Sequence, residues 1–418
     1  MIQAIKGTRD ILPDEVGRWQ FVEQTAQRVF RRYGFREIRT PIFESTDLFA
    51  RGIGEGTDIV SKEMYTFTDR GSRSLTLRPE NTAPVARAAI EHGLFQKPWG
   101  GRLYYVGPMF RYERPQKGRM RQFHQIGVEA FGSTEPSVDA EVIEMSMAFV
   151  SHLGIGGVEL ALNSVGCNQC RPGYRQQLQE ALAPHRRDLC ENCQRRLNEN
   201  PLRILDCKAG CRRFLQDAPT LLDALDPACR EHFEKVRHYL ALLEVPHRVD
   251  PHLVRGLDYY MRTTYEIEGK SLGAQNALLG GGRYDDLVES LGGPAVPGFG
   301  FASGLERLVL SLPPGKGDAE PGPDLYVAIH GEAAFEGGMR ITRELRCRGR
   351  WVEMDPVPGR SLKAQSRRAD QMRARYVLFL GEEELRRGVL NLRRMEGGLQ
   401  SELPASDLDG LAREVGGE

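Results

Sequence analysis

Two strand-like segments joined by a short basic loop constrain the fold of this 418-residue chain more than any other feature. They read GRLYYVGPMFRYE over 101–113 and RQFHQIGVEAF over 121–131, and the loop between them contains RPQKGR. Successive side chains of a strand point to opposite faces of a sheet. The spacing therefore predicts an antiparallel hairpin whose two faces differ in chemistry.

One face of that hairpin gathers charge. Its members are Arg111 and Glu113 on the first strand and Arg121, Phe123, Gln125 and Glu129 on the second. Arginine binds phosphate oxygens through two parallel hydrogen bonds, and a flat aromatic ring can stack on a base. The face therefore suits a pocket for a nucleotide and a small polar substrate. An ion-paired, solvated hairpin would have a similar composition, because surface salt bridges are common.

The rest of the chain predicts at least two domains. LPPGKGDAEPGP over 312–323 is rich in proline and glycine and has no apolar pattern, which is typical of a linker. Strand-like and helical segments alternate after it, which predicts a small α/β domain with a parallel sheet over 324–418. We expect the first domain to span 1–320. It begins with an amphipathic helix over 10–33 and contains a mostly helical, charged segment within 171–245.

Composition excludes several classes of protein. The 57 basic and 57 acidic side chains balance, so there is no overall attraction to nucleic acid or membranes. No apolar run approaches the roughly 20 residues of a membrane helix, and the N-terminus lacks the apolar core of a secretory signal. Eight cysteines in so long a chain are not a disulfide framework. We expect a cytoplasmic protein that does not contact membranes.

Six stretches together resemble the histidyl-tRNA synthetase family of class II aminoacyl-tRNA synthetases. YGFREIRTPIFE, the hairpin and GFGFASGLERL resemble the three class motifs. RGLDYYMRTTYEI and GGGRYDDL resemble the two signatures of the histidine enzymes, and LTLRPENTA resembles their amino-acid-binding loop. The resemblance spans essentially the whole chain. One departure is the threonine pair in MRTTYE, which lies past the two tyrosines and affects only local packing.

The resemblance implies a fold and an activity. The fold is an α+β catalytic domain, in which helices flank the class II antiparallel sheet, with a helical insertion at about 170–245 and a C-terminal α/β anticodon-binding domain. The activity is that of a histidine–tRNA ligase, which activates L-histidine with ATP and transfers it to the 3′ end of tRNA(His). Mg²⁺ would accompany the pyrophosphate. A homodimer would form through motif 1, since twofold symmetry is the commonest arrangement of soluble oligomers.

The resemblance also assigns site residues. Arg111 and Arg255 are the expected catalytic residues. The expected ATP-binding set is Arg111, Glu113, Arg121, Phe123 and Arg307. The expected histidine-binding set is Glu80, Asn81, Thr82, Arg111, Gln125, Glu129, Arg255, Tyr259, Tyr260 and Tyr284.

Local patterns add detail to the third motif and to the RGLDYY signature. Leu305 and Leu308 belong to an apolar helix face that leaves Arg307 on the opposite side, and Gly300 and Gly304 would let the backbone approach a nucleotide. If RGLDYY is a strand, only one of its two tyrosines can face the core.

Arg255 has two interpretations. It could pair with Asp258 or Glu266 as a structural ion pair. Alternatively, it could offset the repulsion between a carboxylate and a phosphate, a role that the resemblance favours.

The cysteines suggest a metal site. CNQC and CENC form a C-x2-C-x19-C-x2-C pattern, and CKAGC follows over 207–211. This spacing is typical of structural zinc, so Cys167, Cys170, Cys190 and Cys193 are candidate ligands. Reduced thiols without metal are the alternative, and the family resemblance does not supply a metal here.

Two other classes of function remain open at this point. The regulatory subunit of ATP phosphoribosyltransferase shares this fold without aminoacylating tRNA, but should lack a C-terminal α/β domain and retain fewer ATP-binding arginines. A class II synthetase for another amino acid should lack the two histidine signatures. Between Arg340 and Arg375 there are eleven basic and four acidic residues. That stretch is either a solvated helix face or a phosphate-binding surface for the anticodon arm.

Overall fold

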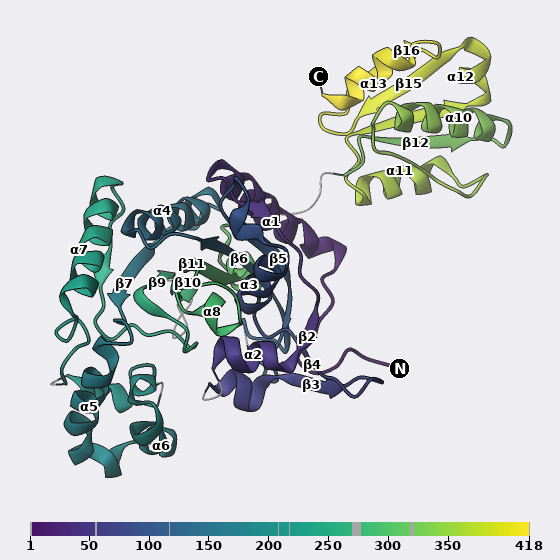
Figure 1. Cartoon of the computed structure of the whole chain (residues 1–418). Helices are drawn as coiled ribbons and strands as arrows, with labels where there is room; N and C mark the ends of the chain where they lie inside the picture. Colours follow the sequence, from purple (N-terminus) through teal and green to yellow (C-terminus); the bar gives the residue numbers. More distant parts are fainter. Residues whose placement is uncertain are drawn as a thin grey trace. The chain divides into compact units, whose positions relative to one another are not determined.

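The computed structural model describes residues 2–54, 57–116, 118–207, 209–216, 218–269, 277–317 and 322–417. The chain divides into two compact units, Met1–Asp318 and Ala319–Glu418 (Figure 1). The division falls within the proline- and glycine-rich stretch 312–323. Among the described residues, no helix is both long and apolar enough to cross a bilayer.

A mixed sheet forms the centre of the first unit. Across the described part of the sheet the order is β1 (Arg36–Glu37), β5 (Arg102–Phe110), β6 (Gln122–Phe131), β11 (Gly298–Gly304), β10 (Ala277–Arg283), β9 (Met261–Gly269), β7 (Val158–Ser164) and β8 (Arg248–Val249). The two edge strands are parallel to their neighbours, and the other pairs are antiparallel. Strands β5 and β6 pair with Met109 opposite Phe123, which confirms the predicted hairpin.

Helices cover one face of this sheet. They are α1 (Pro13–Arg32), α4 (Pro136–His152), α7 (Pro227–Leu242) and α9 (Leu305–Ser311). Ile126 and Val128 of β6 are fully buried in the core beneath them. The apolar face of the predicted hairpin therefore faces the helices, and burying each such side chain stabilises the fold by about 1.5–3 kcal/mol. The charged face must then point the other way.

Shorter elements stand on the opposite face. They are α2 (Thr46–Ile53), α3 (Thr82–Glu91), α8 (Leu287–Ser290) and a small antiparallel sheet of β2 (Phe43–Ser45), β4 (Ser74–Leu77) and β3 (Tyr65–Thr68). Tyr104 packs in the core under the helices, whereas its neighbour Tyr105 packs with α3 and α8. The alternation along β5 thus separates the two layers.

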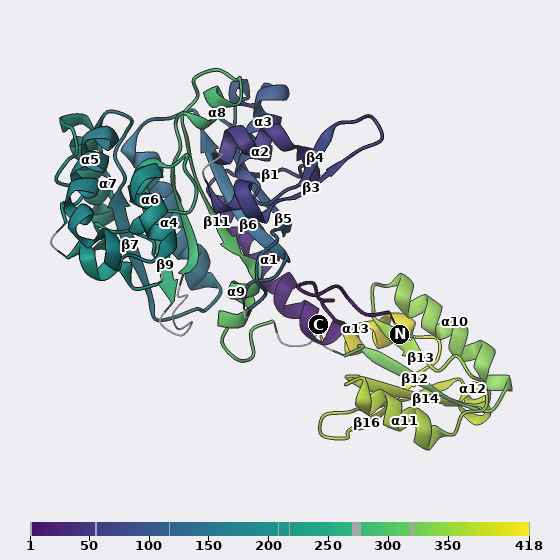
Figure 2. The same cartoon turned by 90° about the horizontal axis from the view of Figure 1, so that it is seen from below.

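The insertion has a small core of its own. Helices α5 (Cys170–Leu182) and α6 (Glu191–Glu199) pack with short helical turns around buried leucines and seven buried or partly buried cysteines. Helix α7 joins the two cores, because Cys229 at its start lies in this cluster while Phe233 and Val236 pack in the core of the main sheet. Figure 2 shows α5, α6 and α7 together, on the side of the unit away from β3 and β4.

The second unit is a sheet with helices on both faces. Its described strands run in the order β13 (Val352–Met354), β12 (Leu325–His330), β14 (Tyr376–Gly381), β15 (Val389–Arg394) and β16 (Gln400–Pro404). The helices are α10 (Ala333–Cys347), α11 (Leu362–Gln371), α12 (Glu382–Arg387) and α13 (Leu408–Gly416). Strands β13, β12 and β14 are parallel as predicted, but β15 and β16 add an antiparallel hairpin. The predicted parallel sheet is therefore confirmed for its three strands, and the hairpin, where Gly397 and Gly398 take positive φ angles and reverse the chain, was not predicted.

Candidate active site

A cavity of about 1030 Å³ lies on the face of the main sheet opposite α1 and α4. The hairpin, the start of α3, strands β9 to β11, the insertion and the segment before β9 all contribute to its wall. Ten of the residues expected to bind substrates line it: Glu80, Thr82, Arg111, Glu113, Phe123, Gln125, Arg255, Tyr259, Tyr260 and Arg307. The structure thus gathers residues that lie up to 227 positions apart in the sequence, from Glu80 to Arg307.

The charged face of the hairpin forms the floor of the cavity. The Arg111 guanidinium carbon lies 5.2 Å from the centre of the Phe123 ring, and its Nε donates to the backbone oxygen of Pro79 at 2.9 Å. These contacts fix the guanidinium in one orientation. Glu113 lines the same cavity, but neither residue belongs to β5, which ends at Phe110, so strand alternation does not account for their placement.

Arg121 departs from its expected place. It does not line the cavity among the described residues; its guanidinium stacks on Tyr112 at 4.1 Å, and its backbone N–H donates to Gly7. Arg119 lines the cavity instead and forms an ion pair with Glu113 at 3.2 Å. The sequence placed Arg119 only in the loop, because strand alternation does not predict where the side chains of a loop point.

Two carboxylates are buried at the inner end of the site. Glu80 accepts hydrogen bonds from the backbone N–H groups of Thr82 and Ala83, at 2.7 and 3.0 Å, and so caps the start of α3. Glu129 accepts from the Thr82 hydroxyl at 2.8 Å and from the Tyr284 hydroxyl. Thr82 therefore links the two carboxylates, because its backbone N–H donates to Glu80 and its hydroxyl donates to Glu129.

The electrostatics of this pair favour a cationic ligand. Burial raises the pKa of Glu129 to about 8, and the neighbouring Glu80 adds to the shift, although Tyr284 and Thr82 oppose it. Burial also raises the pKa of Glu80. Both shifts express the cost of holding anions away from water. A bound cation or a strong donor group would relieve that cost.

Two residues that line the cavity, Gln125 and Arg255, each have a buried polar atom without a partner. Within the described residues, the Oε1 of Gln125 and the Nε of Arg255 are buried without a hydrogen-bond partner. Such atoms cost about 1–3 kcal/mol each when they are left unpaired. An acceptor on Gln125 and a donor on Arg255 are therefore available to a ligand that carries the complementary groups.

Residues 255–260 do not form the predicted strand. They lie in a turn before β9, which starts only at Met261. As a result, both Tyr259 and Tyr260 line the cavity, and their ring centres are 4.7 Å apart. Burial raises the pKa of Tyr260 to about 12, so its hydroxyl remains a hydrogen-bond donor at neutral pH. The expectation that only one tyrosine could face inward was wrong because strand alternation does not apply to a turn.

Arg255 forms one of its two expected ion pairs and also lines the cavity. Its Nη1 donates to Glu266 at 2.7 Å, so the structural ion pair exists, and Asp258 is not the partner. The guanidinium also lies against Gly280, where a Cβ atom would overlap it. A side chain at position 280 would displace Arg255, which explains why this position of the glycine-rich signature needs glycine.

The third motif places Arg307 as predicted. Leu305 and Leu308 are fully buried, and Arg307 points from the other side of α9 into the cavity, where its Nη1 donates to the backbone oxygen of Ala277 at 2.8 Å. Gly304 lines the cavity, and nothing would meet a Cβ there. Gly300 serves another purpose, because a Cβ there would overlap Glu129.

Asn81 and Tyr284 do not line the cavity, but each forms a hydrogen bond with a residue close to it. Asn81 accepts from Thr40 at 2.7 Å and from Arg78 at 3.3 Å, and so ties the amino-acid-binding loop to the segment before β2. Tyr284 is fully buried and donates to Glu129. Sequence reasoning missed Arg78, which donates to the backbone oxygens of Thr40 and Pro108; its place in LTLRPENTA was the available signal.

Arg283, the residue before Tyr284, takes part in a buried network of ion pairs. Arg283 pairs with Asp139 of α4 and with Asp285, and it donates to the backbone oxygen of Ser133 at 2.8 Å. His232 of α7 lies 2.9 Å from Asp139. Although burial alone would raise the pKa of Asp139, Arg283 and the hydrogen bond to His232 bring it below its usual value. This network ties β10 to two helices of the core.

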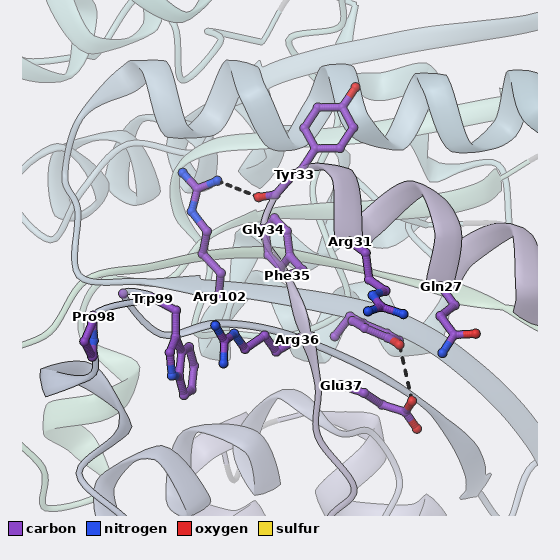
Figure 3. A pocket seen from close by; sticks show the side chains of 12 residues that line it. Gln27, Arg31, Tyr33, Gly34, Phe35, Arg36, Glu37, Pro98, Trp99 and Arg102 are labelled. Atoms are coloured by element: carbon purple, nitrogen blue, oxygen red, sulfur yellow. Dashed lines mark hydrogen bonds between the residues drawn. The ribbon is translucent and has the colours of Figure 1, made fainter.

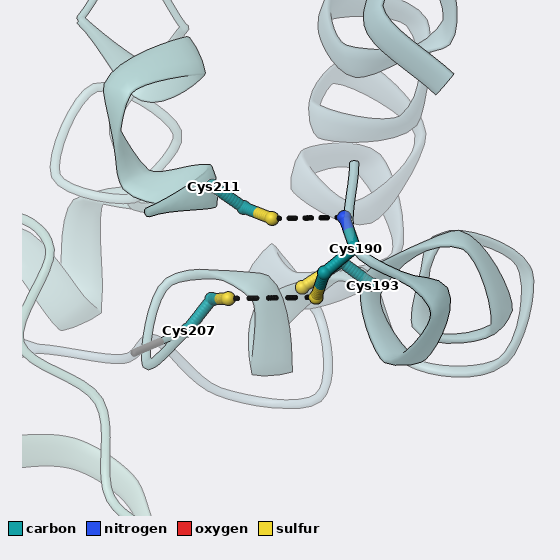
Figure 4. A group of neighbouring side chains, drawn as sticks. All are labelled: Cys190, Cys193, Cys207 and Cys211. Atoms are coloured by element: carbon teal, nitrogen blue, oxygen red, sulfur yellow. Dashed lines mark hydrogen bonds between the residues drawn. The ribbon is translucent and has the colours of Figure 1, made fainter. Parts of the chain in front are cut away.

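The four candidate zinc ligands do not come together. Cys190 and Cys193 lie with Cys207 and Cys211, as Figure 4 shows. Cys167 and Cys170 lie instead with two residues from the start of α7. The single ligand set predicted from spacing is therefore corrected to two separate groups. Spacing identifies a C-x2-C pair, but it does not tell which distant pair completes it.

A second cavity of about 890 Å³ lies at the edge of the main sheet, where α1 ends and β1 begins. Figure 3 shows aromatic and arginine side chains around it, among them Tyr33, Trp99 and Arg102. The guanidinium of Arg36 lies 5.3 Å from the Trp99 ring centre. Residues 33–37 in its wall belong to the stretch that resembles the first class motif, and it shares no lining residue with the first cavity.

Comparison with known proteins gives consistent matches over both units. A family model described as histidyl-tRNA synthetase matches residues 7–308, and one described as anticodon binding domain matches residues 324–414. A histidine–tRNA ligase of Desulforamulus reducens is 53% identical over 407 residues, which is 96% of this chain and 97% of the relative. A histidine–tRNA ligase of Trichlorobacter lovleyi is 54% identical over 400 residues, covering 96% and 95% of the two chains. The crystal structure of apo histidyl-tRNA synthetase from S. aureus superposes with a TM-score of 0.82 at 37% identity, covering 99% of this chain and all of the other.

Proposed function

The chain belongs to the histidyl-tRNA synthetase family, and from this we infer that it is a histidine–tRNA ligase, an ATP-dependent enzyme that activates L-histidine and transfers it to tRNA(His). One observation carries the inference: a single cavity holds the buried carboxylate of Glu80 beside the guanidinium groups of Arg111 and Arg255, and the buried carboxylate of Glu129 lies behind its wall, bonded to the hydroxyl of the lining residue Thr82. Carboxylates attract the ammonium group of an amino acid, and arginines attract its carboxylate and a phosphate.

We propose that polar pairing selects histidine. Neutral imidazole has one N–H donor and one acceptor. Glu129 supplies an acceptor, and the hydroxyls of Tyr259 and Tyr260 supply donors. Glu80, Thr82 and the unpaired Oε1 of Gln125 would receive the ammonium group. An apolar analogue would leave these buried groups unpaired, and such sites reject analogues by large factors.

The first reaction step follows from this placement. An oxygen of the histidine carboxylate attacks the α-phosphorus of ATP, the bond to the bridging oxygen breaks, and pyrophosphate leaves. Both partners are anions, so we propose that Arg111 and Arg255 hold them together and stabilise the charge that develops. Positioning can supply much of the rate, because little covalent chemistry is asked of the protein.

ATP would lie on the floor formed by the hairpin. Phe123 offers a ring face to adenine, Glu113 can accept from its amino group, and Arg307 and Arg119 would meet the outer phosphates. We propose that Mg²⁺ accompanies the pyrophosphate. Glu306 lines the same cavity, and its carboxylate is the kind of hard oxygen donor that Mg²⁺ prefers.

The second step transfers the histidyl group to a hydroxyl of the terminal ribose of tRNA. In the loop over 114–119, Arg119 lines the cavity, and we propose that this loop meets the acceptor end. In the second unit, Lys363, Arg367 and Arg373 are exposed on or beside α11. We propose that this surface contacts anticodon-arm phosphates, since such contacts give affinity without reading bases.

We propose a homodimer built on the first class motif. Strand β1 lies at the edge of the main sheet, and Ile42 and Phe43 are exposed next to it. The second cavity, between α1 and Trp99, lies at the same edge. A second copy would cover these apolar groups. A monomer mass by light scattering at micromolar concentration would contradict the proposal.

A cytoplasmic location is proposed from the thiols. All eight cysteines are unpaired, and thiols stay reduced in the cytosol.

The test of function is ATP–pyrophosphate exchange with each of the twenty amino acids. Exchange with histidine alone is expected. Exchange with a different amino acid would indicate another class II synthetase, and no exchange with any would favour a regulatory subunit. The presence of Arg111, Arg255 and Arg307 in one cavity, and of the matched C-terminal unit, argues against that last outcome.

A further inference from the structure

The insertion contains two compact groups of sulfur and oxygen donors. The first is Cys190, Cys193, Cys207 and Cys211, and the second is Cys167, Cys170, Asp226 and Cys229. Within each group the donor atoms all lie within 4.8 Å of one another. Each group joins one C-x2-C pair to a second pair, with two or three residues between its members, from a later part of the insertion. Aminoacylation needs neither group.

The first group has the dimensions of a metal centre. Figure 4 shows its four side chains pointing toward a common centre from the start of α6 and from the turns that follow it. The sulfurs of Cys190 and Cys207 are 3.9 Å apart. Zinc binds thiolate sulfur at about 2.3 Å, so two sulfurs on a tetrahedron around it lie about 3.8 Å apart. The observed spacing therefore fits a tetrahedral thiolate site, and it is far from the roughly 2 Å of a disulfide.

The second group has a mixed donor set. The sulfurs of Cys167 and Cys170 are 3.6 Å apart, and both lie close to the Oδ2 of Asp226, at 3.2 and 3.1 Å. The other oxygen of Asp226 accepts from the backbone N–H of Cys229 at 2.7 Å and caps α7. One carboxylate oxygen thus caps the helix while the other faces the sulfurs. Three sulfurs and one oxygen are a donor set that zinc accepts.

The small core of the insertion gives a reason for such centres. The buried side chains that pack with the cysteines are mostly leucines of α5, α6 and the turns between them. A segment of about 60 residues buries too little apolar surface to hold many short helical turns in place by itself, and natural domains of this size often use a metal. Two metal centres would fix the turns that carry the later pair of each group.

We propose that the insertion binds two zinc ions, one through Cys190, Cys193, Cys207 and Cys211 and one through Cys167, Cys170, Asp226 and Cys229. Both ions are structural, because four protein donors leave no open position for a substrate or water. Zinc release would loosen the insertion before it affected the main sheet, since the two have separate cores.

Each centre lies next to a contact with the turn that carries Arg255. Cys207 lines the catalytic cavity, and Arg203, four residues earlier, donates from Nη1 to the backbone oxygen of Arg255 at 3.3 Å. Arg171 follows Cys170 and donates to the backbone oxygens of Val165 and Tyr260. Both ions would therefore position the wall of the cavity indirectly, through the turn 255–260.

Metal content of the full chain tests the proposal. Protein purified in zinc-supplemented buffer without chelator should contain two zinc ions per chain by elemental analysis. Cys207→Ser should lower the content to one, and so should Cys229→Ser. Cys347→Ser is the matched control, because this exposed cysteine of the second unit belongs to neither group, and it should retain two.

The variants also separate two centres from one. A single centre made of Cys167, Cys170, Cys190 and Cys193 would give one ion in the unmodified chain, and that ion would survive Cys207→Ser and Cys229→Ser. Asp226→Asn preserves the helix cap but removes the charged donor. It should weaken retention of one ion against a competing chelator while the other ion stays bound.

The zinc content of the unmodified chain tests the proposal even if a variant fails to fold. Two ions per chain support the proposal, whereas one or none overturns it. The outcome is independent of histidine activation, because metal content is measured without substrates. Loss of pyrophosphate exchange with two ions still bound would contradict the proposed function and leave the zinc centres intact.

Discussion

Two arginines of the first unit, Arg283 and Arg255, differ in how their polar atoms are satisfied. Arg283 is fully buried, and every nitrogen of its guanidinium has a partner: Asp139, Asp285 and the backbone oxygens of Ser133 and Glu135. Arg255 pairs with Glu266, but its Nε has no partner within the described residues. The hydrogen bonds of Arg283 are therefore complete without a ligand, whereas the Nε of Arg255 would need a ligand as its acceptor. Buried charge by itself therefore does not identify an active site; incomplete pairing in a cavity does.

The largest effect is expected from removing Arg283, whose hydrogen bonds are complete. Arg283→Ala should destabilise the first unit by about 3–5 kcal/mol, because Asp139 would remain buried without its main partner. Arg248, which forms three ion pairs on the surface, is the matched control, and Arg248→Ala should cost no more than about 1 kcal/mol. The midpoint of urea unfolding, followed for the first unit, measures both. Equal losses would show that the buried network is no more important than a surface pair.

The next test removes the arginine of the incomplete network. Arg255→Ala should fold and bind ATP but lose histidine-dependent pyrophosphate exchange by roughly 10²–10³-fold, or about 2.7–4 kcal/mol, as expected for a lost charge contact in the transition state. Arg255→Lys should recover only part, because a point charge does not reproduce the two parallel hydrogen bonds.

Glu266→Gln is the control for Arg255. It removes the charge of the partner but leaves Arg255 in the cavity, so a smaller loss is expected. If Arg255→Ala kept near-normal exchange, or if its only defect were a lower melting temperature, the ion pair with Glu266 would be structural and the catalytic assignment would be wrong.

The smallest expected effect concerns pH. The pKa of Glu129 is raised to about 8 in the ligand-free protein, and a ligand that needs the carboxylate must displace a proton below that pH. Affinity for histidine should therefore fall by about tenfold from its high-pH limit at pH 7, one unit below this pKa. Glu129→Gln should bind more weakly and lose this pH dependence. Calorimetry between pH 7 and 8.5, in buffers of different ionisation enthalpy, also detects the proton released.

The raised pKa of Glu129 also makes the stability of the folded protein depend on pH. Since the pKa is raised on folding, the contribution of Glu129 is fully present below its unfolded value near 4.5 and is lost as the pH rises through about 8. Bound histidine should remove part of that loss by favouring the ionised carboxylate. A ligand-induced stabilisation that did not grow between pH 7 and 8.5 would place the ligand away from Glu129.

Much of the catalytic unit was predictable because it rests on local patterns. Alternation along the hairpin placed Phe123 and Gln125 on the cavity face and Ile126 in the core, as the structure shows. The 3.6-residue period placed Arg307 opposite Leu305 and Leu308. Both predictions use the geometry of a regular element, which the sequence specifies over a few residues.

Predictions failed where the chain is irregular. Residues 255–260 form a turn, so alternation gave the wrong relation between Tyr259 and Tyr260. Arg119 replaces Arg121 at the cavity because the loop of the hairpin does not continue the strand. In the second unit, the strands β15 and β16 were not predicted, so the antiparallel part of the sheet was missed.

The sequence by itself determined the family, the order of the elements and the chemistry of the candidate side chains, because motifs and periodicity are read within short windows. Only the tertiary structure decided which distant groups meet. Seven cysteines between Cys167 and Cys229 offer many pairings of similar spacing, and packing of the insertion chooses two of them. Likewise, Glu266 rather than Asp258 pairs with Arg255 because β9 brings it there. Such choices depend on contacts between residues far apart in the chain, whose energies are set by the whole fold and not by any local segment.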